Sequence, residues 1–234
     1  MAISSNSVFH FTSGIRNLNS ILKGEFKITY CFEVIDMKNT KYGAGMPMVS
    51  FCDIPLSQIN RHIKHYGSFG IGLSKEWAIK NGLNPVLYLQ SQSKNAELIE
   101  PFLKGQMKGN KFLKRFQLIK KGSKSIVVDI FKGERKANAD AFKGLFMYLK
   151  NYEGEPFRNA APSGSTIRFY NEREWRYVPN EADFPDNIAY EPLITQDEYK
   201  TWRSRSKKKL YFPDMALTFT AQDVCCLLYT SRCV

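Results

Sequence analysis

The feature that most constrains the fold of this chain is its series of short β-type segments separated by equally short helical segments. Side chains typical of strands fill residues 8–12, 26–32, 46–52 and 68–73, and each segment is followed by turn or helix signals. A doubly wound parallel sheet would need a regular βαβ period. This sequence has no such period, so we predict an α+β fold of short strands and short helices rather than a doubly wound sheet.

Capping and chain-breaking residues set the expected helix bounds in the first third of the chain. Ser13 is predicted to cap a short helix that ends at Gly24. Pro55 is expected to open a further short helix that reaches about residue 65. Ser74 is predicted to cap a helix around Trp77. These helices are too short to be stable alone and must pack on the sheet.

The middle of the chain differs in composition from the rest. Residues 92–125 are polar and rich in lysine, with weak helical periodicity, and we interpret them as a basic helical insertion over the sheet. We interpret residues 1–224 as one α+β domain. The remaining segments are predicted to be a strand (126–131), a helix (137–150), a loop (151–165) and the two ends of one late strand (167–170 and 174–178).

The last residues of the sequence have an unusual coding property. Residues 226–231 can be encoded by a string whose reverse complement begins with codons for Arg-Cys-Val and a stop, which is how the chain ends. The string resembles a transposon-end sequencing adapter. We therefore predict that residues 225–234 are a non-native tail and that the natural reading frame is interrupted near Val224.

The net charge of +12 is concentrated in two parts of the chain. Basic side chains crowd residues 104–136, and a second basic run covers residues 200–209. Such surfaces gain free energy from counterion release when they bind a polyanion, which favours RNA or DNA as a partner. A solvated helix face, or a contact with an acidic partner protein, explains the same charges. The candidate nucleic-acid-binding residues are Lys111, Lys114, Arg115, Lys207 and Lys208.

Other features exclude several classes of protein. The N-terminus lacks the basic start and apolar run of a secretion signal, and the uncharged stretch at 42–52 is too short for a membrane helix. The five cysteines form no CxxC or Cys/His pattern. We therefore expect a cytoplasmic protein without membrane association, in which Cys31 and Cys52 are buried thiols. His62 and His65 could share a helix face, but no acidic or thiol ligand is near them in the sequence, so we expect no metal.

Two segments carry the side chains best suited to chemistry. His10 stands in the middle of an apolar strand, and Glu172, Glu174 and Arg176 alternate on a late segment. A buried structural histidine explains the first segment equally well. A solvent-exposed strand face with paired charges explains the second.

A resemblance to known families joins these two segments. Residues 48–55, 65–67, 70–77 and 172–179 together resemble the AbiGi abortive-infection family, which confers phage resistance, and the similarity runs from residue 8 to about residue 224. The shorter motifs His10-Phe11-Thr12, residues 18–24 and Glu172-Arg173-Glu174 resemble NAD-dependent ADP-ribosyltransferases of the diphtheria-toxin-like branch.

The second resemblance implies an α+β fold with a split mixed or antiparallel sheet, and it implies a role for each residue of the motif. NAD would be the substrate, with Glu174 stabilising the ribosyl cation and Glu172 orienting or deprotonating the acceptor. His10, with Thr12 beside it, would hold the ribose, and Tyr66 would stack on the nicotinamide ring. Tyr42 and Phe69 are alternatives to Tyr66.

The sequence thus leads to two functional hypotheses. The first is a phage-defence protein with an ADP-ribosyltransferase-like fold that transfers ADP-ribose from NAD to a nucleic acid or a protein. The second is a non-catalytic antitoxin or regulatory subunit of a two-gene system, with a cognate toxin as its partner. A cleft lined by His10, an aromatic ring and Glu174 is required by the first hypothesis.

Overall fold

The main structural element is a large antiparallel sheet. The computed structural model describes residues 6–107, 117–119, 144–158, 161–180, 183–184, 191–205, 211–212 and 215–229. Within these residues the strand order is β14 (Val224–Tyr229), β5 (Phe69–Ser74), β1 (Ser7–Thr12), β4 (Lys41–Cys52), β12 (Glu174–Tyr177), β6 (Asn84–Pro85). Two further strands, β3 (Thr29–Asp36) and β8 (Gln117–Ile119), also pair with β4. The predicted α+β class with a main antiparallel sheet is confirmed.

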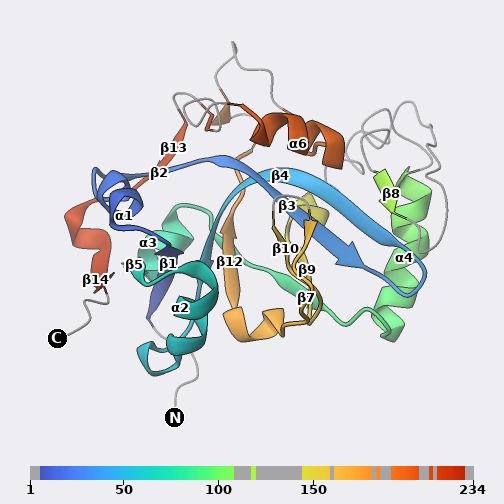
Figure 1. Ribbon diagram of the computed structural model, residues 1–234, viewed down its shortest axis with the longest axis horizontal. Coiled ribbons are helices and arrows are strands. Elements are labelled where there is room, and N and C mark those ends of the chain that lie inside the picture. The colour runs from blue at the N-terminus through green and yellow to red at the C-terminus, as the bar shows by residue number, and fades with distance from the viewer. Residues whose placement is uncertain are drawn as a thin grey trace.

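Strand β4 connects the two halves of the sheet. Its first part pairs with β3 from Asp36↔Lys41 to Thr29↔Met48, and its last residues pair with β12. Figure 1 shows β3 and β4 as a long hairpin across the molecule. One hydrophobic cluster contains Phe51 and the other contains Tyr42, so β4 contributes to both clusters of the core.

Short helices and small sheets surround the main sheet (Figure 1). Two pairs of short strands are antiparallel, β13 (Ala216–Thr218) with β2 (Glu25–Lys27) and β10 (Phe157–Arg158) with β11 (Ala161–Pro162). The pair of β7 (Leu87–Leu89) and β9 (Leu149–Asn151) is parallel. The remaining elements are α1 (Ile15–Ile21), η1 (Leu56–Gln58), α2 (Asn60–Tyr66), α3 (Lys75–Lys80), α4 (Lys94–Met107), η3 (Phe169–Glu172), α6 (Gln196–Arg203) and η6 (Ala221–Asp223).

A glycine fixes the position of α2 against β1. Gly67 follows α2 with φ of 110°, a value that L side chains rarely adopt. A Cβ at this position would lie 2.3 Å from the carbonyl oxygen of Thr12. The close approach brings His65 and Tyr66, at the end of α2, next to the strand that carries His10.

Several predicted bounds in the first part of the chain are corrected. The N-cap of the helix after Ser13 is Gly14, which has no side chain to cap it. Ser74 caps α3 as predicted, and its side chain accepts a hydrogen bond from the Trp77 amide. The strand predicted at 26–32 divides at Ile28, because β2 pairs with β13 and β3 pairs with β4. The helix predicted after Pro55 is interrupted, with η1 preceding α2.

Three later predictions are also corrected. The end of the predicted helix 137–150 is wrong, since residues 149–151 form β9, which pairs with β7. Residues 167–170 are no strand end, because residues 169–172 form η3 and only β12 is extended. Within 92–125, residues 94–107 are helical as predicted, but residues 117–119 form β8. The predicted strand 126–131 lies outside the described residues.

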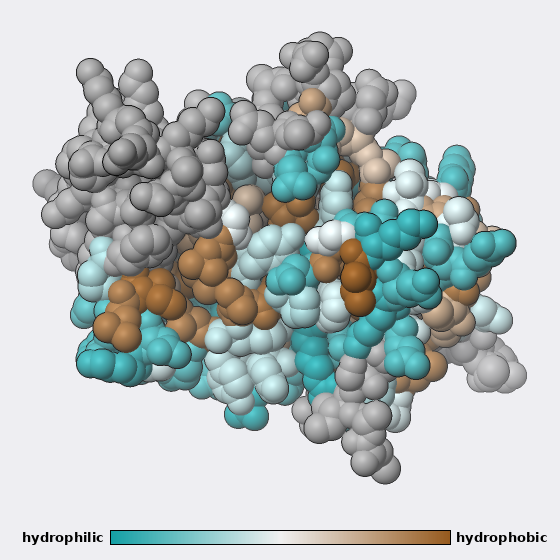
Figure 2. All heavy atoms as spheres, turned by 180° about the vertical axis from the view of Figure 1, so that it is seen from behind, coloured by the Kyte–Doolittle hydropathy of each residue, from teal (hydrophilic) through white to brown (hydrophobic). Residues whose placement is uncertain are grey.

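The last described strand, β14, pairs with β5 at the edge of the main sheet. It contains residues 225–229 of the segment predicted to be a non-native tail, and that origin stays a prediction. Figure 2 shows the face opposite to that of Figure 1, where hydrophobic side chains gather mainly on the side of α4 and hydrophilic ones cover much of the remaining described surface.

Candidate ligand-binding cleft

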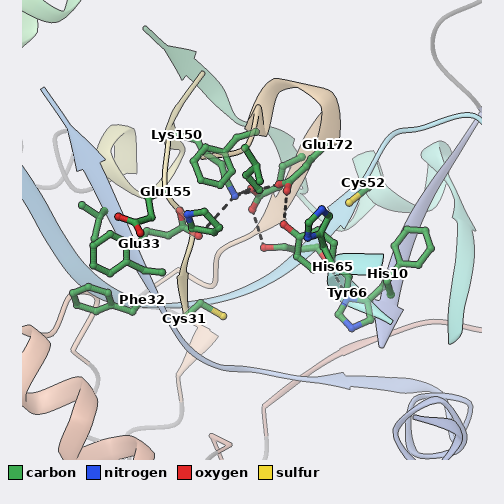
Figure 3. Close-up of a pocket in the computed structure, with 18 of the residues that line it drawn as sticks. His10, Cys31, Phe32, Glu33, Cys52, His65, Tyr66, Lys150, Glu155 and Glu172 are labelled. Carbon is green, nitrogen blue, oxygen red and sulfur yellow. Dashed lines mark hydrogen bonds and ion pairs between the residues drawn. The ribbon is translucent and has the colours of Figure 1, made fainter. Parts of the chain in front are cut away.

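A cleft of about 260 Å³ opens where β1, β3, β4 and β12 meet α2, β9 and η3. It contains both acidic and aromatic side chains (Figure 3). Its polar lining consists of His10, Glu33, Ser50, His65, Lys150, Glu155, Glu172 and Glu174, and its rings are Phe9, Phe11, Phe32, Tyr66, Phe157 and Phe169.

The register of three neighbouring strands brings the distant sequence segments together. Cys52 on β4 pairs with Phe9 on β1 and with Glu174 on β12. Strand alternation then places Glu174 and Arg176 on one face of the sheet. The predicted proximity of the first and the late segment therefore results from β4, which lies between them.

The carboxylate of Glu174 is saturated with hydrogen-bond donors. Its Oε1 accepts from Ser50 Oγ at 2.8 Å and from Arg176 Nε at 2.6 Å. Its Oε2 accepts from Lys150 Nζ at 2.5 Å and from Arg176 Nη2 at 3.3 Å. A carboxylate offers about four lone-pair positions, so these donors use its full acceptor capacity. Burial alone would raise the pKa of Glu174, but Arg176 and Lys150 outweigh it and hold that pKa well below its usual range.

A larger charged cluster surrounds this carboxylate. Arg176 is fully buried and also contacts Glu33 at 3.3 Å, while Lys150 lies 3.9 Å from Glu33 and 3.4 Å from Glu172. Three carboxylates thus face two cations, which leaves one negative charge in excess when all are ionised. Figure 3 shows Lys150 between Glu33 and Glu172.

Among the three carboxylates of the cluster, Glu172 has its negative charge least balanced by nearby cations. Burial raises its pKa, and the negative charge of Glu174 adds to this effect, against the opposing influence of Lys150. Its Oε1 accepts a hydrogen bond from the Tyr66 hydroxyl. Burial, followed by the charge of Glu172, raises the pKa of Tyr66, so this phenol stays a donor.

His10 is held in one tautomer. Its Nδ1 lies 2.9 Å from the backbone carbonyl oxygen of Ser50, which can only accept, so Nδ1 carries the proton. Burial lowers the pKa of His10 and outweighs the stabilising effect of that bond on the charged ring. The ring contacts Phe26 and Phe51 at centroid distances of 5.2 and 5.6 Å. His10 is therefore a neutral ring fixed in the cleft wall.

The structure brings together four of the residues predicted for a site. His10, Tyr66, Glu172 and Glu174 all line the cleft. Thr12 does not line it and accepts a hydrogen bond from the Asn17 amide instead. The aromatic alternatives, Tyr42 and Phe69, are also absent from the lining. The predicted nucleic-acid-binding residues Lys111, Lys114, Arg115, Lys207 and Lys208 lie outside the described residues.

Sequence reasoning missed Lys150, Glu33 and Ser50, which complete the charged cluster. Lys150 stood at the end of a predicted helix, and no spacing connected it with Glu174. The interpretation of Glu172, Glu174 and Arg176 as an exposed strand face is wrong, because all three are buried. The arginine in the motif was a usable signal, since a buried carboxylate requires a buried cation nearby.

The cysteines and histidines near the cleft form no metal site in the described part of the chain. Cys31 and Cys52 line the cleft, and burial raises the pKa of Cys31 to about 12 and that of Cys52 well above its usual range. Both are protonated thiols and weak nucleophiles. In addition, none of the described helices is both long and apolar enough to cross a membrane.

The fold and the cleft together define an α+β domain whose antiparallel sheet encloses a buried carboxylate cluster beside a ligand-sized cavity. The family model described as "Putative abortive phage resistance protein AbiGi, antitoxin" matches residues 24–230. The chain belongs to this AbiGi family, as its motifs predicted.

The abortive phage resistance protein AbiGi of Lactococcus lactis subsp. cremoris is 29% identical over 158 residues, which cover 65% of this chain and 57% of that protein. This chain thus matches little more than half of its relative. No solved structure matches the chain.

Proposed function

We propose that this protein is the antitoxin-type regulatory component of an abortive-infection system and that it acts by binding a partner protein. The observation that carries the proposal is the saturation of Glu174 by donors from Ser50, Lys150 and Arg176. A carboxylate that hydrogen-bonds a substrate hydroxyl must offer it a free acceptor position. Here the carboxylate is used to hold β4, β9 and β12 together, which is a structural role.

The description of the family as an antitoxin supports the same proposal. An antitoxin implies a cognate toxin, so the partner is a protein that the host must keep inactive. The relative from Lactococcus lactis is named as a phage-resistance protein, in agreement with a defence system. The biological role of this chain would then be to restrain its partner until infection.

Co-expression with the product of the adjacent gene tests this proposal. We expect the neighbouring protein alone to slow growth of a host strain, and co-expression of this chain to restore growth and to yield a copurifying complex. The Glu172→Gln variant should restore growth equally well, because it keeps an acceptor for Tyr66 while it removes the ionisable carboxylate that catalysis would use. Loss of rescue in a folded Glu172→Gln variant, or the absence of any complex, would contradict the proposal.

A second candidate function is NAD-dependent mono-ADP-ribosylation of a nucleic acid or a protein. The observation that favours it is the presence of His10, Tyr66, Glu172 and Glu174 in one cleft. The hydrogen bonds that already occupy both carboxylate oxygens of Glu174 leave little room for a substrate contact. An ADP-ribosyltransferase-like fold and activity therefore stay predictions. Incubation with labelled NAD and cell extract separates the two functions. If a folded Glu174→Gln variant loses label transfer and the exposed control Glu153→Gln keeps it, the transferase function would be favoured over the antitoxin function.

A further inference from the structure

A second cavity lies beside the cleft and is more polar. Its volume is about 680 Å³, and it is formed by η1, α2 and the segment around η3. The two cavities share His65, Tyr66, Ile167 and Glu172, so the hydrogen bond from Tyr66 to Glu172 stands in the wall between them. The remaining lining is Ser57, Gln58, Asn60, His62, Arg168, Tyr170, Asn171 and Arg173.

His62 gives this cavity an unsatisfied buried polar group. Its side chain lines the cavity, the residue is 7% exposed, and neither ring nitrogen has a hydrogen-bond partner among the described residues. The ring is held between Phe11 and Tyr66, each at a centroid distance of 6.0 Å. Buried polar groups are nearly always hydrogen-bonded, so this ring is positioned for a partner that the described residues do not supply.

Arg173 provides the second buried polar group without a hydrogen-bond partner among the described residues. It is the only described non-glycine residue with positive φ (44°), and it lies between Glu172 and Glu174. This backbone conformation separates the side chains, since both glutamates line the cleft while Arg173 lines the second cavity. Its Nη1 is buried without a partner among the described residues. Strained backbone is kept where it positions a functional side chain.

The charges around this cavity favour an anion. Arg173 and Arg168 are its cationic side chains, and Arg168 is partly balanced by Glu153 at 3.9 Å. The acidic side chain in the lining is Glu172, whose pKa is raised by burial. Hydroxyl and amide groups from Ser57, Asn60 and Asn171 supply further neutral donors.

We propose that this second cavity is a binding site for a nucleotide diphosphate, with Arg173 and His62 as its phosphate ligands. An arginine fork matches phosphate geometry, and a neutral imidazole contributes one N–H donor. The volume lies in the range of sites for nucleotide-sized ligands. The inference does not depend on the proposed antitoxin role, because binding of the ligand is measured without any partner protein.

Calorimetric titration of the full chain with three probes tests the proposal. ADP and inorganic pyrophosphate should bind, and adenosine, which lacks phosphate, should not. Binding of pyrophosphate together with failure of ADP would leave an anion site that excludes nucleosides and would overturn the nucleotide assignment. Failure of both phosphate probes at millimolar concentration would overturn the site itself.

Substitutions in the cavity locate the bound phosphate. Arg173→Gln should weaken ADP binding by about tenfold or more, the effect of removing one charge-assisted contact. His62→Phe should weaken it several-fold while the ring keeps its packing against Phe11 and Tyr66. Arg16→Gln, at an exposed arginine of α1, is the matched control and should bind as the wild type does. Equal affinity in Arg173→Gln and Arg16→Gln would overturn the assignment.

A readout in the wild-type protein covers the case in which Arg173→Gln does not fold. Pyrophosphate should shift the ring resonances of His62 in NMR spectra and leave those of His10, which lies in the other cavity, nearly unchanged. Shifts at His10 but not at His62 would place the anion in the first cleft and contradict the proposal.

Discussion

The ammonium group of Lys150 lies 2.5 Å from the carboxylate of Glu174, and both side chains are buried. The pair connects β9 with β12, which belong to different sheets. Lys150 also stands 4.9 Å from the ring centroid of Phe169, so its methylene stem and charge are enclosed on several sides. This ion pair is therefore part of the tertiary structure rather than a surface contact.

Removal of the lysine charge should strongly destabilise the protein. In Lys150→Met, Glu174 and Glu172 lose a buried partner, which typically costs about 3–5 kcal/mol of unfolding free energy. Urea unfolding followed by circular dichroism measures this difference. The control is Lys38→Met, which breaks an exposed pair with Glu97 and should leave the unfolding free energy nearly unchanged. Similar losses in the two variants would show that the buried cluster contributes little.

The raised pKa of Glu172 predicts a specific pH dependence. The folded protein keeps the proton on Glu172 at a pH where the unfolded chain has released it, so this residue costs stability as the pH rises through its folded pKa. Glu172→Gln removes that cost. The unfolding free energy of this variant should therefore increase relative to that of the wild type as the pH rises above 4.5, the ordinary pKa of a glutamate. If the unfolding free energy of the variant instead falls relative to that of the wild type as the pH rises, Glu172 is ionised and paired in the folded state.

Gly67 should tolerate no side chain. In Gly67→Ala the new Cβ would meet the carbonyl oxygen of Thr12 at 2.3 Å in addition to the strain of positive φ. We expect a loss of about 3 kcal/mol or more, from strain and overpacking together. Gly82→Ala is the matched control, because Gly82 also has positive φ but nothing within 4 Å of its Cβ position, and should cost about 1–2 kcal/mol. Thermal unfolding of both variants checks the difference.

The described cysteines should differ in reactivity. Cys225 is exposed, whereas Cys31 and Cys52 are half-buried, and burial raises the pKa of Cys31 to about 12 and that of Cys52 well above its ordinary value. Iodoacetamide at mildly alkaline pH should modify Cys225 in the folded protein and reach Cys31 and Cys52 only after unfolding. Peptide mass spectrometry identifies the modified positions. Rapid labelling of Cys52 in the folded protein would mean that the cleft opens readily.

Local sequence signals predicted the parts of the fold that local interactions determine. Ser74 and the helix around Trp77 are an example, because a side-chain cap and a following apolar turn specify a helix without help from the rest of the chain. The pairing of His10 with Glu174 could be predicted only through motif resemblance, since β4 brings them together across the sheet.

Other parts of the site carry no local signal. Lys150 ends a segment with helical composition, yet pairing with β7 makes its residue part of a strand. Arg173 adopts a conformation that no sequence pattern specifies, because its cost is compensated by the positions of both neighbouring glutamates. Tertiary packing determines such features and overrides local propensity.

The position of β4 between distant strands has a consequence for the order of events during folding. Glu33 reaches the charged cluster from β3, Lys150 from β9, and Glu174 and Arg176 from β12, so the cluster needs pairings that are distant along the chain. Such non-local pairings close late in folding, because loop entropy must be overcome first. Until then these charges stay hydrated and separate. The cleft should therefore be absent from every partly folded intermediate, and a partner that recognises it would bind only molecules that have completed folding.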